Sequence, residues 1–245
     1  MALLDNLIKS ATIIPPKIIL YGEPGVGKTT LAAKSGALLI DCENGAGSIP
    51  GLTRTPYLAT WAEMRDYLFE IAREGMGDTK VLAIDTLDWM LTRITEHVVM
   101  VLDDDQAITN TLGSSHGGYF KGREVVQNIV YRELLPVLNK INSNGVALLM
   151  LAHAKHENSK SPEGFDRSRA VPAIPGWIRE PFTEWADAVL YAGTDRNVAT
   201  ECSNIVFAKN RYQLPPSLPL DWPTLIKQIS NVNNTNTKEA TNGKS

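Results

Sequence analysis

A glycine-rich string near the amino terminus constrains the fold of this chain more than any other feature. Residues 22–29 read GEPGVGKT and fit the pattern GxxxxGK[ST], between an apolar segment at 17–21 and a stretch of helical character. In this order the loop turns its backbone N–H groups toward a phosphate at the amino terminus of a helix. The residues expected to bind nucleotide phosphates are Gly22, Glu23, Pro24, Gly25, Val26, Gly27, Lys28, Thr29 and Thr30.

Side chains in and beyond this loop indicate ATP hydrolysis with Mg²⁺. A simple glycine turn would not explain why a lysine and a threonine follow it. Lys28 is expected to reach the β and γ phosphates as a catalytic residue, and the Thr29 hydroxyl to bind Mg²⁺. Asp85 ends an apolar run over 80–85, the form expected of an aspartate that holds Mg²⁺ through water. The sequence therefore predicts an ATPase with ATP and Mg²⁺ as cofactors.

Apolar segments of strand length recur along the chain. Continuous apolar runs are typical of parallel strands covered on both faces. Helical patterns alternate with them at 61–74, opened by a Thr60/Glu63 capping box, and at 123–142, closed by Asn144-Gly145. We therefore expect the α/β fold of a P-loop NTPase, with a mostly parallel central sheet flanked by helices. The expected strands are 17–21, 37–41, 80–85, 146–152, 187–192 and 204–208.

The ends of the chain and two internal stretches differ from this pattern. Residues 103–122 and 154–176 match neither period and are expected to be long loops. The sequence predicts an extension at 1–16, one domain at 17–230 and a disordered tail at 231–245 that is almost without apolar residues.

Neither a signal peptide nor a bilayer-spanning run is visible, so we expect a cytoplasmic protein without membrane contact. The net charge of −3 gives no overall basic surface for nucleic acid. Any contact with nucleic acid is therefore expected to be local.

The general base for ATP hydrolysis is expected outside the Asp85 strand, because the next residue is Thr86 rather than glutamate. Glu43 lies two residues past Asp41, at the carboxyl end of the strand after the phosphate-loop helix. Ligands bind at that edge of open α/β sheets, so Glu43 could activate the attacking water, although a solvated turn glutamate is the alternative. His153 follows the strand at 146–152 and could touch the γ-phosphate or be structural.

Two cations follow the expected strand at 204–208. On an oligomeric ATPase, Lys209 and Arg211 could reach the neighbouring subunit's site and stabilise transition-state charge, as arginine fingers do. The alternative is a pair of solvated surface charges.

Taken together, these positions resemble the RecA-type recombinase core, most closely the short RecA-like single-strand annealing ATPases of phages. The resemblance spans about residues 16–222 and differs from AAA+ proteins in where the glutamate lies. The positions that carry it are the phosphate loop, Asp41-Cys42-Glu43, Asp85, the GSSHGG segment at 113–118, His153 and Lys209-Asn210-Arg211.

The resemblance implies partners. Single-stranded DNA would bind two loops, at 112–123 and 154–176, and a homo-oligomer, filament or ring, would place the ATP site between subunits. DNA would stimulate hydrolysis, the protein would act in phage-type recombination in the cytoplasm of an infected bacterium, and a single-strand-binding protein would be a further partner. Aromatic faces for stacking are present in the first loop and cations for phosphates in both, although these could also be solvated loop charges. The DNA-binding residues would be Tyr119, Phe120, Lys121, Arg123, Lys155, Lys160, Arg167 and Arg169.

The sequence also departs from that family. The γ-phosphate sensor, usually glutamine, is His153, and the short amino-terminal segment lacks a polymerisation motif, which favours annealing over strand exchange. A RecA-core helicase motor or helicase-loading ATPase would use the same residues. A small-molecule phosphotransferase, with the long loops as a lid, is a third possibility, and it would not need Glu43 as a base for water.

Overall fold

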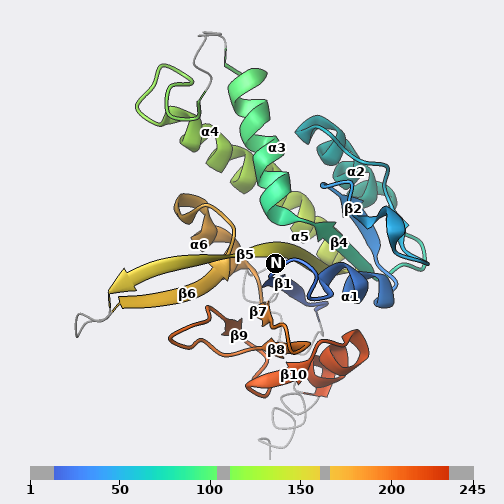
Figure 1. Cartoon of the computed structure of the whole chain (residues 1–245). Helices are drawn as coiled ribbons and strands as arrows, with labels where there is room; N and C mark the ends of the chain where they lie inside the picture. The colour runs from blue at the N-terminus through green and yellow to red at the C-terminus, as the bar shows by residue number, and fades with distance from the viewer. Residues whose placement is uncertain (1–13, 104–110, 161–165, 232–245) are drawn as a thin grey trace, which may run out of the picture.

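A central sheet carries the functional elements of the computed structural model, which describes residues 14–103, 111–160 and 166–231. The strands follow the order β10-β8-β7-β1-β5-β4-β2-β3, with β6 paired to β5 and β9 paired to β7 (Figure 1). Their bounds are β1 (Lys17–Gly22), β2 (Leu38–Asp41), β3 (Thr53–Arg54), β4 (Val81–Asp85), β5 (Ala147–Lys160), β6 (Asp166–Pro172), β7 (Ala188–Ala192), β8 (Asn197–Ala199), β9 (Lys209–Asn210) and β10 (Ser217–Pro219).

The pairings from β7 through β3 in this order are all parallel, and β6, β8, β9 and β10 add antiparallel pairs. The expected fold class is therefore confirmed: an α/β P-loop NTPase fold with a mostly parallel sheet flanked by helices. Because the parallel strands run the same way, their carboxyl ends meet at one edge, where ligands bind in such sheets.

Helices cover both faces of the sheet. Alternate strand residues enter opposite cores: Ile19 and Tyr21 pack with helices on one face, and Ile18 and Leu20 with helices on the other. The first face is covered by α2 (Trp61–Glu74), α3 (Leu87–Met100), α4 (Lys121–Ile129), α5 (Leu135–Ser143) and α6 (Gly176–Trp185); the second by α1 (Lys28–Lys34) and a helix at 222–231.

The two helices expected from sequence patterns are present. Helix α2 begins at the predicted capping box, in which the Thr60 hydroxyl accepts from the Glu63 N–H at 3.3 Å and the Glu63 carboxylate accepts from the Thr60 N–H at 2.9 Å. The second is a continuous run broken by a π-turn, η3 (Val130–Leu134), between α4 and α5. Pro136 has no N–H to donate to the preceding turn, which accounts for the irregular ladder just before it.

Two predictions about strands and loops were wrong. The stretch at 154–176 is not one long loop, because β5 continues to Lys160 and pairs with β6 as an antiparallel ribbon that projects from the sheet (Figure 1). Of the ribbon's described side chains, only those at its base are buried, at residues 170–172, so the rest of its sequence shows no apolar period. Residues 204–208 form no strand; Val206 makes an isolated bridge with Ala170, and β9 begins at Lys209.

Most of the predicted amino-terminal extension and of the predicted tail, residues 1–13 and 232–245, lies outside the described part of the chain. Within the described part, none of the helices is both long enough and apolar enough to cross a lipid bilayer.

Candidate active site

The phosphate-binding loop follows β1 directly and ends in the first turn of α1, as its sequence predicts. Gly27 caps α1 with a φ of 106°, a left-handed conformation that favours glycine. A Cβ on Gly22 would lie 2.5 Å from the carbonyl oxygen of Ala192 in the neighbouring β7. Both glycines are therefore required by the backbone path, in addition to any contact with a phosphate.

Lys28 is buried beneath this loop. Its ammonium donates to the carbonyl oxygens of Gly22 at 2.8 Å and Glu23 at 3.0 Å. Burial lowers the pKa of Lys28, and the nearby carboxylates, Asp85 foremost, act in the opposite direction. The ammonium thus lies at the centre of the loop, where the phosphate oxygens of a nucleotide would bind.

The residues predicted to bind Mg²⁺ lie together. The Thr29 hydroxyl donates to Asp85 Oδ2 at 2.7 Å, and Asp85 is almost fully buried at the end of β4. Burial raises the pKa of Asp85 to about 6, even though Thr29 donates to it. The buried Asp85 carboxylate is not fully compensated by positive charge, and a hydroxyl lies beside it. Oxygen donors of this kind suit Mg²⁺. Thr29 and Asp85 would hold the ion, which would neutralise charge on the phosphates.

Replacing Asp85 by asparagine should stabilise the protein free of nucleotide and magnesium at pH 8, by on the order of 3 kcal/mol. A pKa raised from 3.8 to about 6 means that the folded chain binds the proton more tightly, so ionisation destabilises the fold as pH rises through this window. Urea unfolding at pH 8 and pH 4 would measure the gain, which should disappear at the lower pH. Equal stability at pH 8 would contradict it; Asp66→Asn, at an exposed position, is the control.

Glu43 lies at the same edge, held by a turn that Asp41 organises. Asp41 is 1% exposed; its Oδ1 accepts from the backbone N–H of Glu43 at 3.2 Å and of Asn44 at 2.7 Å. Its Oδ2 pairs with Arg54 at 3.0 Å. The Glu43 carboxylate accepts a hydrogen bond from the Thr86 hydroxyl, so Thr86, beside Asp85, binds the glutamate that β2 supplies. The sequence did not predict that Arg54 would pair with Asp41 or that Thr86 would bind Glu43.

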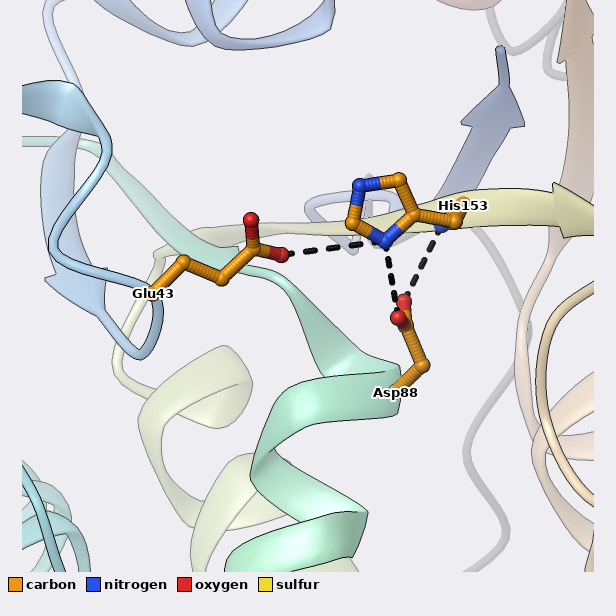
Figure 2. A group of neighbouring side chains, drawn as sticks. All are labelled: Glu43, Asp88 and His153. Atoms are coloured by element: carbon orange, nitrogen blue, oxygen red, sulfur yellow. Dashed lines mark hydrogen bonds and ion pairs between the residues drawn. The ribbon is translucent and has the colours of Figure 1, made fainter. Parts of the chain in front are cut away.

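His153 completes the group, together with Asp88, which the sequence analysis missed (Figure 2). His153 Nδ1 lies 2.8 Å from Asp88 Oδ2 and 3.7 Å from Glu43 Oε1, and the His153 backbone N–H donates to Asp88 Oδ1 at 3.0 Å. One ligand-type atom from each residue lies within 4.8 Å of the others. The hydrogen bonds account for this cluster without an ion. An aspartate three residues past Asp85 is the signal that could have been found.

These residues surround a hollow of about 320 Å³. It brings together the predicted nucleotide-binding and magnesium-binding residues, except Gly22, Glu23 and Val26, with Glu43 and His153. It is lined by Pro24, Gly25, Gly27, Lys28, Thr29, Thr30, Asp41, Glu43, Gly45, Ile49, Asp85, Thr86 and His153.

Lys209 and Arg211 lie away from this hollow. Lys209 pairs with Val189 near the start of β7, whereas the phosphate loop lies beside Ala192 at its end. The Lys209 ammonium donates to three carbonyl oxygens at the carboxyl end of α6, at 2.7 to 2.8 Å, so it caps that helix. The Arg211 side chain is 55% exposed and lies 3.6 Å from Asp187.

The first predicted DNA segment presents one prominent aromatic residue. Tyr119 is 94% exposed, and both Tyr119 and Phe120 have left-handed backbone conformations with φ of 53° and 59°. The guanidinium carbon of Arg123 lies 4.2 Å from the centre of the Phe120 ring and 5.6 Å from that of Trp177. Phe120 and Arg123 therefore contact each other, while Tyr119 projects outward; Lys121 is exposed at the start of α4.

The cations of the second segment lie on the β5–β6 ribbon, residues 154–160 and 166–172. Register places Lys155, Arg167 and Arg169 on one face with Glu157, and Lys160 on the other. Lys155 lies 3.1 Å from Glu157, which also pairs with Arg179. The Arg169 guanidinium contacts Cys202 and lies over the Phe207 ring.

Comparison with known proteins agrees with the phosphate-loop chemistry. A family model described as an AAA domain matches residues 14–212, and a search of curated proteins finds no match. Among solved structures, the crystal structure of the RadB recombinase is similar with a TM-score of 0.40 and 12% identity, covering 73% of this chain and 75% of that chain. The family match spans the loop, Glu43, Asp85 and His153. This chain therefore belongs to the AAA domain family of P-loop ATPases.

Proposed function

We propose that this ATPase binds single-stranded DNA and acts in strand annealing during phage-type homologous recombination. The observation that carries the proposal is the path of β5, which passes through the ATP site and then forms the basic ribbon. His153 lies beside Gly22 in the parallel pairing with β1, and from Ala154 onward the same strand pairs with β6. A nucleotide and a bound polyanion would thus contact one continuous strand.

A second contact joins the loop and the ribbon. His156 Nε2 lies 3.5 Å from the carboxylate of Glu23 in the phosphate loop. Binding of phosphates would change the charge next to Glu23, and binding of DNA would change the charge around the ribbon. The two sites therefore have a short physical route through which each could bias the other.

The ribbon supplies local positive charge on a chain whose net charge is −3. On its first face, Lys155, Arg167 and Arg169 accompany a single carboxylate, Glu157, which Arg179 also neutralises. Cations in a row suit a phosphate backbone, and their contacts weaken as salt displaces them. Tyr119 adds an exposed ring on which a base could stack.

ATP hydrolysis, rather than phosphate transfer to a small molecule, is supported by the placement of Glu43. Its carboxylate lies within the hollow beside Thr86 and Asp85, where a water attacking the terminal phosphate would need a base. We infer further that the chain works as a homo-oligomer with the site between subunits. Arg211 is exposed at the far end of β7 from its own site, so only a neighbour's site could receive it.

ATP turnover with and without poly-dT at low salt tests this proposal. We expect DNA to bind and to raise turnover several-fold, and we expect annealing of complementary strands without unwinding of a duplex. Turnover indifferent to DNA, together with no binding, would contradict the proposal, and ATP-driven unwinding would favour a helicase motor.

Replacing Tyr119 by alanine should weaken single-stranded DNA binding by about 1–3 kcal/mol, or roughly 5–150-fold, because one base would lose its stacking partner. Fluorescence anisotropy with labelled poly-dT measures this effect. Tyr67→Ala, at a half-exposed position on α2, is the matched control and should bind like the wild type. Unchanged affinity in Tyr119→Ala would remove this residue from the interface.

A further inference from the structure

We propose that Asp88 is the positioning residue of His153, holding its ring so that the Nε2–H can donate to the terminal phosphate of ATP. The inference rests on the proposed role of His153 in the ATP site. Asp88 lies in the first turn of α3, and its two carboxylate oxygens bind different groups of one residue: Oδ1 accepts from the backbone N–H of His153 and Oδ2 faces Nδ1. This double contact fixes both the strand and the ring.

The geometry determines which ring nitrogen of His153 is available to donate to a phosphate. Nδ1 faces Asp88 at 2.8 Å and Glu43 at 3.7 Å, so it carries a proton between two carboxylates. Nε2 lies on the side of the ring away from Asp88 (Figure 2). A neutral ring with its proton on Nδ1 would offer only a lone pair at Nε2, which would repel a phosphate oxygen. Donation from Nε2 therefore requires a proton on both nitrogens.

The surroundings favour this doubly protonated ring. The hydrogen bond to Asp88 raises the pKa of His153, and the charge of Glu43 acts in the same direction, while burial and Lys28 on α1 lower it. Burial alone would raise the pKa of Asp88, but the hydrogen bonds from His153 bring it below its ordinary value, so Asp88 stays ionised. A charged histidine would place a cation of the same chain on the terminal phosphate, where it would stabilise negative charge.

Asp88→Asn keeps the shape of the side chain and removes its charge. Because the pKa of His153 is raised, the charged ring is present at low pH and lost as pH rises through that value; without the Asp88 charge this loss should occur at lower pH. We expect the alkaline limb of the pH profile of kcat, measured without DNA, to move to lower pH. Turnover at pH 8 should fall roughly ten- to hundredfold, with a smaller change in KM. Asp66→Asn is the control.

The Asp88→Asn substitution in a His153→Gln variant separates an effect on His153 from a general disturbance of the fold. In His153→Gln the amide N–H donates without titrating, so adding Asp88→Asn there should change turnover at pH 8 by less than about threefold. An equal loss in both backgrounds, or an unmoved alkaline limb, would overturn the proposal.

Histidine NMR of the nucleotide-free protein gives a readout that does not depend on turnover. In the wild type, His153 should titrate above the ordinary value of 6.5, with a persistent Nδ1–H, and in Asp88→Asn it should titrate lower. Titration of wild-type His153 at or below 6.5 would overturn the proposal even if the protein were inactive. Loss of DNA stimulation with these shifts intact would instead contradict only the proposed function.

Discussion

Replacing Glu43 by glutamine should lower the rate of ATP hydrolysis by about 10²–10⁴-fold and leave ATP binding nearly unchanged. Glutamine preserves the volume and can still accept the hydrogen bond from the Thr86 hydroxyl, but it cannot take a proton from water. Turnover measured by phosphate release, and binding measured by isothermal titration, separate the two effects.

The matched control is Glu74→Gln, at the exposed end of α2, which should hydrolyse ATP at the wild-type rate. Turnover of Glu43→Gln within about threefold of the wild type would show that another group activates the water. Weakened ATP binding with an unchanged rate constant would mean that Glu43 contributes to the shape of the site rather than to the chemistry.

Replacing Lys28 by alanine should weaken ATP binding by about 2–5 kcal/mol, the usual effect of removing one partner of a buried, hydrogen-bonded charge pair. The ammonium lies beneath the loop, bound to the carbonyls of Gly22 and Glu23, where phosphate oxygens would be its natural partners. The ATP-dependent rise in melting temperature, which follows ligand affinity, should disappear. Lys34→Ala, at the exposed end of α1, should retain the full rise; a full rise in Lys28→Ala would contradict the assignment.

The same variant tests the oligomer. Mixed with Arg211→Ala, it should restore turnover, because a Lys28→Ala subunit would present an intact Arg211 to the intact site of its neighbour. Arg211 is the better residue to change, since it donates to one carbonyl at the end of α6, that of Glu184 at 3.1 Å, whereas Lys209 donates to three and its loss would disturb the fold. Failure to restore turnover at any mixing ratio, with Arg211→Ala itself impaired, would exclude a role in trans.

Local sequence was sufficient for features whose geometry depends on neighbouring residues. The phosphate loop and the Thr60/Glu63 capping box are each complete within a few positions, so chain geometry alone brings their groups together. Glu43 and Asp85 were predicted because both follow buried parallel strands, whose carboxyl ends meet at one edge. The contact between Glu43 and Thr86 confirms that these two turns lie side by side.

The β5–β6 ribbon was missed because pattern reasoning depends on burial. Apolar periodicity marks a strand that packs in a core, and β5 loses that pattern where it leaves the sheet near His153. Lys209 was expected to project from the chain, but its partners are carbonyls of α6, more than twenty positions earlier. Their meeting depends on how β9 pairs with β7.

By itself, the sequence determined the class of fold and the phosphate loop, and it predicted that Thr29, Asp85 and Glu43 lie at one edge of the sheet. Each of these follows from a contiguous motif or from the edge shared by parallel strands. Only the tertiary structure decided the pairing of Asp88 with His153, the bracing of the Glu43 turn by Asp41 and Arg54, and the separation of Arg211 from its own site. These depend on strand register and helix packing, which bring together side chains that no local spacing relates.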